Sequence, residues 1–430
     1  MFARKVHKFQ HAALALAAAL AVSLAHADAV TQGQERAARA ITAAENGDHA
    51  SAADLFAEAL ALRPNHPGLT LRFAQASARA GRDEAALRAL EDYAAMGLKA
   101  DPDAPHFASL AEHPRMAAVR ERLAQNAMPL GEVTVVATLD EPRLLAEGVA
   151  IDPATNRLFV GDVHNRRILA IDSTGAKSTF IATAAHGLLG AFGMSLVDGK
   201  LWVASSGTLH TAGLKAGEKG RAGVFAFDAE GRLAKRAILS GPKEEFSLGD
   251  LAVARTGDVF ASDSMSGRIY RMAPGASTLQ NLIVSEAFHS PQGLALSPDE
   301  TVIAIADYSN GIHIVGRDGK SHTILPMPPQ TTLHGIDALV RHGRDLIAVQ
   351  NGINPQRVIL IRMAAGWTAV EGLDVLAANL PDLSEPTLAT LAGEDLIVVG
   401  NGQWSRFADD GAIKVEEPFA PTRIVRLKLP

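Results

Sequence analysis

The stretch EGVAIDPATNRLFVGDVHNRRILAID, from Glu147 to Asp172, decides the fold of this chain. It contains three short apolar segments separated by turns, and the first segment opens on a glycine. The same order returns as GDLAVARTGDVFASDSMSGRIYRM from Gly249 and as GLALSPDETVIAIADYSNGIHIV from Gly293. A repeat of this length built only from strands predicts the blades of a β-propeller.

Six copies of the repeat can be placed by their opening residues, which are Gly148, Gly193, Asp250, Gly293, Gly335 and Thr387. The segment Val133–Leu139 precedes the first copy and has no blade of its own, while the last copy ends in RIVRLKL. A propeller avoids exposed sheet edges when an early strand completes the last blade. We therefore predict an all-β, six-bladed propeller over residues 131–430, closed by Val133–Leu139.

Residues 31–127 have a different, helical pattern that is rich in Ala, Leu, Glu and Arg. A shift of 34 residues places Gly81, Ala86 and Leu90 on Gly47, Ala52 and Phe56. Glycine at the turn and alanine where helices cross are typical of the tetratricopeptide repeat. The segment is thus predicted to be a smaller N-terminal all-α, tetratricopeptide-like domain that docks a protein partner; a plain helical bundle is the alternative.

The first 27 residues have the features of a signal peptide. Arg4, Lys5 and Lys8 precede an apolar run from Ala12 to Leu24, and small residues stand before Asp28. A membrane anchor is the alternative, but it needs about 20 apolar residues. No other segment is long and apolar enough to cross a membrane. We expect a periplasmic or secreted protein, and the absence of cysteine is compatible with this location.

The charge of the chain argues against nucleic acid as a partner. The formal net charge is −6, and it becomes about −9 without residues 1–27. A protein that binds nucleic acid needs basic side chains to neutralise phosphates.

The strand repeats resemble NHL-type blades, and residues 131–430 resemble the senescence-marker-protein/gluconolactonase family of six-bladed propellers. The resemblance rests on Glu147-Gly148, on Gly249-Asp250 with Asp263, on SPQGLALSPD ending at Asp299, and on His334-Gly335. It implies a hydrolase that acts on a lactone or another small polar molecule.

The resemblance also implies a divalent metal, often calcium, at the mouth of the central channel. Carried over to this chain, the metal ligands are Glu147, Gln292 and His334. Glu147 matches the family, Gln292 keeps an amide oxygen in place of asparagine, and His334 replaces an aspartate. One carboxylate, one amide and one imidazole suit a transition metal better than calcium. The same set could instead bind no metal and offer hydrogen bonds to a polar ligand.

Hydrolysis of a lactone needs a Lewis acid that polarises the carbonyl and a base that activates water. Asp250 is the first candidate for the catalytic base by position, and His334 is the second; a hydrogen-bonded strand end is the alternative for Asp250. We expect Phe192 and Glu385 at the same mouth, and the insertion Gly207–Gly223 as its lid or rim.

Two functions remain open at this point. The first is metal-assisted lactone or ester hydrolysis at the channel mouth. The second is a non-catalytic scaffold that uses the helical repeats and the propeller surface to bind a partner.

Overall fold

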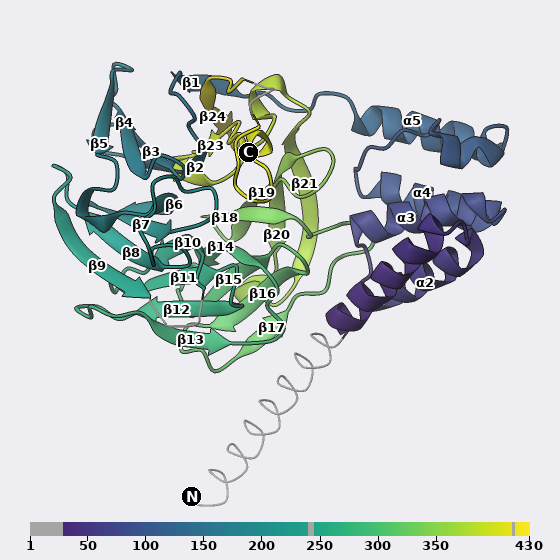
Figure 1. The fold of residues 1–430 in the computed structure, drawn as a ribbon, viewed down its shortest axis with the longest axis horizontal. Helices are drawn as coiled ribbons and strands as arrows, with labels where there is room; N and C mark the ends of the chain where they lie inside the picture. Colours follow the sequence, from purple (N-terminus) through teal and green to yellow (C-terminus); the bar gives the residue numbers. More distant parts are fainter. Residues whose placement is uncertain (1–28, 240–244, 415–417) are drawn as a thin grey trace, which may run out of the picture.

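A computed structural model describes residues 29–239, 245–414 and 418–430. The predicted signal peptide at residues 1–27 lies outside these described residues. The chain forms a ring of β-sheets with a helical domain packed at its side, as shown in Figure 1. This is the predicted combination of a six-bladed propeller with an N-terminal tetratricopeptide-like domain.

The helical domain consists of antiparallel helices joined by short turns. A first helix covers residues 29–45, and the others are α2 (His49–Leu62), α3 (Pro67–Arg79), α4 (Asp83–Ala95) and α5 (Met116–Asn126). The helical domain also contains the 3₁₀ turn η1 (Pro105–Leu110). Four further 3₁₀ turns lie in loops of the propeller: η2 (Ala185–Gly187), η3 (Ala365–Trp367), η4 (Pro381–Leu383) and η5 (Trp404–Arg406). No helix among the described residues has the length and apolar character to cross a membrane.

The 34-residue repeat has a clear structural basis. Gly47 and Gly81 adopt positive φ angles of 79° and 72° at the turns that precede α2 and α4, and glycine reaches this conformation without strain. Ala52 and Ala86 are fully buried at equivalent places where helices cross. A larger side chain at either alanine would push neighbouring helices apart.

The described strands form six four-stranded antiparallel sheets, which are the blades. Blade 1 holds β2 (Ala146–Asp152), β3 (Arg157–Asp162), β4 (Arg167–Ile171) and β5 (Lys177–Ile181). Blade 2 holds β6 (Gly190–Val197), β7 (Lys200–Ser206), β8 (Ala222–Phe227) and β9 (Leu233–Leu239). Blade 3 holds β10 (Leu248–Val253), β11 (Val259–Asp263), β12 (Arg268–Met272) and β13 (Gln280–Val284). Blade 4 holds β14 (Pro291–Leu296), β15 (Val302–Asp307), β16 (Gly311–Gly316) and β17 (His322–Ile324). Blade 5 holds β18 (Ile336–His342), β19 (Asp345–Gln350), β20 (Arg357–Met363) and β21 (Val370–Ala378).

Blade 6 closes the ring with the predicted strand exchange. Its sheet order is β1-β24-β23-β22, formed by β1 (Thr134–Leu139), β22 (Ala389–Ala392), β23 (Asp395–Val399) and β24 (Thr422–Lys428). The strand β1 pairs antiparallel with β24, with Val135 opposite Val425. The first strand of the ring therefore completes the last sheet, as the spare segment Val133–Leu139 predicts.

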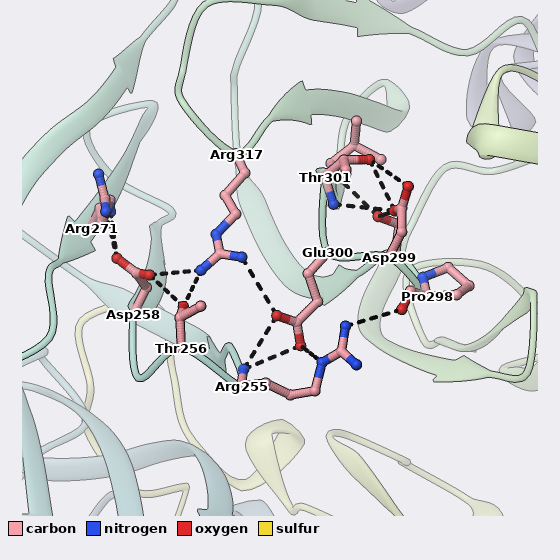
Figure 2. Close-up of polar contacts among 11 residues, drawn as sticks. Arg255, Thr256, Asp258, Arg271, Pro298, Asp299, Glu300, Thr301 and Arg317 are labelled. Atoms are coloured by element: carbon pink, nitrogen blue, oxygen red, sulfur yellow. Dashed lines mark hydrogen bonds and ion pairs between the residues drawn. The ribbon is translucent and has the colours of Figure 1, made fainter.

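A network of ion pairs joins blades 3 and 4 at the end of the ring where the inner strands finish (Figure 2). Asp258, in the turn after β10, is 3% exposed and accepts hydrogen bonds from Arg271 Nε at 2.7 Å and Arg317 Nη2 at 2.7 Å. Glu300 accepts a bond of 3.0 Å from Arg255 Nε. Since these charges are matched across two blades, the network holds the blades in register.

The helical domain docks on loops that join the second and third strands of blades 4 and 5. Arg63 donates to the Ser309 carbonyl at 2.6 Å, and the Lys99 amide donates to the Asn354 carbonyl at 2.9 Å. Leu130 and Ala378 exchange two backbone hydrogen bonds of 3.0 Å at the joint between the domains. These contacts fix the helices against the propeller.

Candidate active site

Five of the six inner strands have an irregular pairing near their first residues. In each case the pairs at the start of the strand are followed by a residue that is displaced from the ladder: Glu147, Phe192, Gly249, Gln292 and Asp337. A β-bulge of this kind re-aims a side chain out of the sheet. All five residues line one cavity, so the bulges determine what faces the channel.

This cavity lies at the mouth of the central channel and has a volume of about 520 Å³. Carboxyl and amide side chains of blades 1, 4, 5 and 6 line one part of it: Glu147, Gln292, Asp337, Asn351, Gln356 and Glu385. Its volume is in the range that suits a small-molecule ligand.

Glu147 is the least exposed acid of the cavity lining. Its side chain is 6% exposed, and Trp404 Nε1 donates to its Oε2 at 2.6 Å. Burial, together with the nearby charge of Asp337, raises the pKa of Glu147 well above its usual range. Its own carbonyl accepts a hydrogen bond of 2.8 Å from Thr387 Oγ1, which ties blade 1 to blade 6.

Asp337 is oriented by a short chain of hydrogen bonds. Tyr308 donates its hydroxyl proton to Asn351 Oδ1 at 3.0 Å, and Asn351 Nδ2 donates to Asp337 Oδ2 at 2.7 Å. Burial raises the pKa of Asp337 to about 6, although the bond from Asn351 acts in the opposite direction. The carboxylate is thus held in one orientation towards Glu147.

Asp250 lies one residue beyond the bulge of β10 and is not among the residues that line the cavity. Its carboxylate lies against the backbone of Gly193, where a Cβ atom would come within 2.2 Å of Oδ1. Burial raises the pKa of Asp250 to about 7, while bonds from the amides of Leu251 and Leu294 lower it. The carboxylate predicted as the catalytic base therefore does not line the cavity, although its charge acts on Glu147.

Gln292 reaches into the space that Gly249 leaves empty. Its Oε1 would be 2.9 Å from a Cβ at position 249, and its Nε2 donates to Ser290 Oγ at 3.1 Å. With the amide nitrogen bonded in this way, the amide oxygen is available to the cavity.

His334 does not line the cavity. This corrects the prediction that it holds a metal together with Glu147 and Gln292. Its ring packs on His66 of the helical domain at 4.7 Å between centroids, and Nδ1 lies 2.8 Å from the Ser309 carbonyl oxygen. Burial and the neighbouring His66 and Arg63 hold the pKa of His334 well below its usual value. His334 belongs to the interface between the domains.

The reason for this correction is the conformation of Gly335. Gly335 has φ +71° and precedes β18, whereas Gly148 and Gly293 follow the bulge residue inside their strands. The place of Gln292 in blade 5 is therefore taken by Asp337. Counting back from the end of the second strand, where Gln350 pairs with Ile336, would have identified it.

Two long loops form the rim on the other side of the cavity. The predicted rim insertion of blade 2 contributes Leu209, His210 and Lys219, and the loop after β23 contributes Trp404. The two loops meet where Gly411 approaches the Leu209 carbonyl. Phe192 and Glu385 also line the mouth as expected, whereas sequence reasoning missed Trp404 because it lies in an irregular loop.

Within the described residues, no group of three or more His, Asp or Glu side chains is arranged to hold a metal ion. The donor set that does converge, Glu147, Gln292 and Asp337, includes an amide. Two carboxylates and an amide oxygen are hard ligands of the kind that calcium prefers. Asp337 thus supplies the second carboxylate, in the place that the sequence analysis had given to His334.

Comparison with protein families confirms both resemblances. Residues 145–328 match the model of the SMP-30/Gluconolactonase/LRE-like region, and residues 43–111 match that of the Tetratricopeptide repeat. No curated protein matches the chain.

Solved structures with similar propellers have several activities. A gluconolactonase from Xanthomonas campestris is 20% identical with a TM-score of 0.48, over 71% of this chain and 93% of its own. A PQQ-bound aldose sugar dehydrogenase from Streptomyces coelicolor is 15% identical with a TM-score of 0.47, over 70% and 98%. A virginiamycin B lyase from Staphylococcus aureus is 11% identical with a TM-score of 0.45, over 70% and 100%. No activity follows from these likenesses.

Proposed function

We propose that this protein hydrolyses a lactone or ester in the channel-mouth cavity, with the help of a divalent cation. The observation that supports this proposal is the convergence of Glu147, Gln292 and Asp337 from equivalent bulge positions of three blades. None of the carboxylates of Glu147, Asp337 and Asp250 forms an ion pair with a described residue. Glu147 is buried and Asp250 and Asp337 are partly buried, and acids in such places without a counter-charge are costly and have pKa values perturbed in the manner of functional sites.

Glu147, Gln292 and Asp337 are the residues that would hold the cation, and calcium fits their oxygen atoms. When bound, the ion would supply a Lewis acid that polarises the substrate carbonyl. A cation would also offset the repulsion between Glu147 and Asp337, which now raises the pKa of Glu147. Trp404 and Asn351 each occupy one carboxylate oxygen of these acids and thereby orient the other.

The chemical step that fits these side chains is attack by water on the carbonyl carbon. Because Asp250 does not itself line the cavity, a second water carries the proton to it as the oxygen of the attacking water bonds to that carbon, and the bond between the carbonyl carbon and the ester oxygen then breaks. The proton passes to the departing oxygen, so a lactone yields a hydroxy acid. A carboxylate whose pKa is about 7 is suited to accept and return a proton near neutral pH.

We also propose that residues 1–27 direct export to the periplasm or medium. The basic residues and the apolar run support this proposal.

The decisive experiment measures bound metal and lactone turnover in the purified protein and in Glu147→Gln. We expect a stoichiometric divalent ion in the wild type, and a loss of activity of about a thousandfold in the variant. Glu286→Gln, which changes an exposed glutamate away from the cavity, is the matched control and should keep both properties. A wild-type protein without metal and without turnover would exclude the hydrolase.

A second candidate function is capture of a protein partner by the helical repeats. A cleft of about 560 Å³ supports it, which the helices form together with Pro329 and Gln330 of the propeller. If metal and turnover are both absent, binding of a partner that Arg88→Glu abolishes would support this alternative, since Arg88 lines the cleft.

A further inference from the structure

The cavity has two chemically different sides. The acids and amides of the proposed reaction come from blades 1, 4, 5 and 6. Blades 2 and 3, together with the rim loop of blade 6, contribute the large apolar side chains, which are Phe192, Leu209, Phe246, Met265 and Trp404. The two charged side chains on this side, Lys219 and Glu245, are exposed, and Trp404 lies between the two sides because its Nε1 donates to Glu147. A ligand that fills the cavity therefore meets polar groups at one end and apolar groups at the other.

The apolar side contains two exposed side chains that the protein itself leaves uncovered. Leu209 is 49% exposed and Met265 is 63% exposed, and both line the cavity. Phe192 and Phe246 continue this surface inward, where each is 6% exposed. Apolar surface of this kind at a cavity mouth gains free energy when a ligand removes it from water.

Two of the hydroxyl groups on this side, those of Thr208 and Ser264, are already engaged within the protein. Thr208 Oγ1 bonds to Thr211 Oγ1 at 3.2 Å, and Ser264 Oγ donates to the Ser247 carbonyl at 3.3 Å. A ligand with several hydroxyl groups would have to bury some of them against phenylalanine and methionine. Each buried hydroxyl without a partner opposes binding.

The rim loop that carries Leu209 is fastened in place. Arg166, which is 3% exposed, donates to the Gly213 carbonyl at 2.8 Å and pairs with Glu218 at 3.1 Å. His210 packs on Trp404 at 5.0 Å between centroids, which joins this loop to the rim loop of blade 6. The apolar side is thus preformed, and a ligand would not have to order it.

We propose that the substrate is a lactone or ester with an apolar alkyl or aryl substituent, and not a polyhydroxylated sugar lactone. This inference rests on the proposed hydrolysis for the position of the carbonyl, which lies towards Glu147 and Asp337. The substituent then extends along Phe192 and Phe246 towards Met265 and Leu209. Water still supplies the oxygen of the new acid, and the ring oxygen still leaves as a hydroxyl group.

The test compares kcat/KM for unsubstituted γ-butyrolactone, a series of γ-alkyl lactones and glucono-δ-lactone. We expect kcat/KM to rise about threefold for each methylene until the chain fills the apolar side. A flat series, or a preference for glucono-δ-lactone, would overturn the inference even if hydrolysis is real.

Variants show where the selectivity arises. Met265→Ser should reduce the advantage of the long-chain over the short-chain lactone by about threefold. Val284→Ser is the matched control, because Val284 is a 58% exposed apolar residue on the outer strand of the same blade and does not line the cavity. An equal effect of both variants would contradict the proposed position of the chain.

A binding measurement separates this inference from the proposed reaction. γ-Alkyl lactams present the same ring and chain but resist hydrolysis, and calorimetry can follow their binding. Affinity that rises with chain length, in a protein that turns over no lactone, would support the ligand class and exclude the hydrolase. Affinity that does not depend on chain length would overturn the ligand class.

Discussion

The two ends of the propeller contain buried or partly buried carboxylates in opposite electrostatic situations. At the end where the inner strands finish, Asp258 is bonded to Thr256, Arg271 and Arg317. Burial acts to raise the pKa of Asp258, but these hydrogen bonds lower it below the usual value. At the cavity end, burial raises the pKa of Asp250 to about 7 and that of Asp337 to about 6.

This contrast separates the structural acids from those that are available for chemistry. A carboxylate that is paired with two arginines cannot bind a cation or accept a proton without losing those bonds. The acids of the cavity keep their charge at a cost to stability, as is typical of residues retained for function. Removal of a carboxylate, or a change of pH, should therefore change the free energy of unfolding in opposite directions at the two ends.

The largest effect on stability is expected from Asp258→Ala. The change leaves Arg271 and Arg317 without their carboxylate, and we expect it to lower the free energy of unfolding by about 3 kcal/mol in urea titrations. Asp318→Ala is the control, because Asp318 is 61% exposed and pairs only at 3.5 Å with Lys320. Equal stability of the two variants would show that the network does not join the blades.

The dependence of stability on pH should contain contributions from the acids at both ends of the propeller. Asp250 and Asp337 have raised pKa values when folded, so the stability they contribute is complete below about pH 4 and is lost as the pH rises to about 7. Asp258 has a lowered pKa, so its contribution is present above about pH 4 and is lost below it.

Thermal unfolding in metal-free buffer should therefore give maximal stability near pH 4 to 5, falling by about 2 kcal/mol towards pH 7. Addition of calcium should raise stability more at pH 7 than at pH 4, because Asp337 is largely ionised at pH 7 and protons compete less with the cation. A protein that gains stability steadily from pH 4 to 7 without metal would contradict the contrast.

A smaller and opposite effect is expected from Asp337→Asn. Removal of this charge relieves the repulsion with Glu147, so the metal-free variant should be more stable than the wild type by about 1 kcal/mol at pH 7. Calcium should no longer stabilise the variant. Calorimetry with and without calcium measures both changes, and a loss of stability in the metal-free variant would show that the bond from Asn351 outweighs the repulsion.

The smallest effect is expected from Glu300→Gln. Glu300 belongs to the same network as Asp258, but its closer partner Arg255 is 75% exposed to solvent, and its second partner Arg317 lies 3.5 Å away. Solvent weakens such a pair, so we expect a loss of about 0.5 kcal/mol. A loss as large as that of Asp258→Ala would mean that the whole network acts as one unit.

The fold was predictable because it repeats. The six copies and the spare segment Val133–Leu139 led to the correct architecture and to the strand that closes it. The 34-residue spacing of Gly47 and Gly81 likewise predicted the helical repeats. Periodic features of this kind depend on short-range patterns that are present in the sequence itself.

The site was only partly predictable because its register depends on bulges and loops. Glu147 and Gln292 line the cavity as expected, but Gly335 lies outside its strand and made His334 seem equivalent to them. Asp337 and Trp404 were missed, since the first depends on one displaced residue and the second on a loop without a pattern. A shift of one residue changes which side chain faces the channel.

The exchange of strands in blade 6 has a consequence for biosynthesis. Thr134 is translated long before its partner Arg426, so the ring stays open until the chain has been synthesised beyond Arg426. During that time β1 and blade 5 present unpaired or uncovered edges, which favour association with other nascent chains. The helical domain has mostly local contacts and can fold first, so a chain truncated before Thr422 would carry folded helices beside an unclosed sheet.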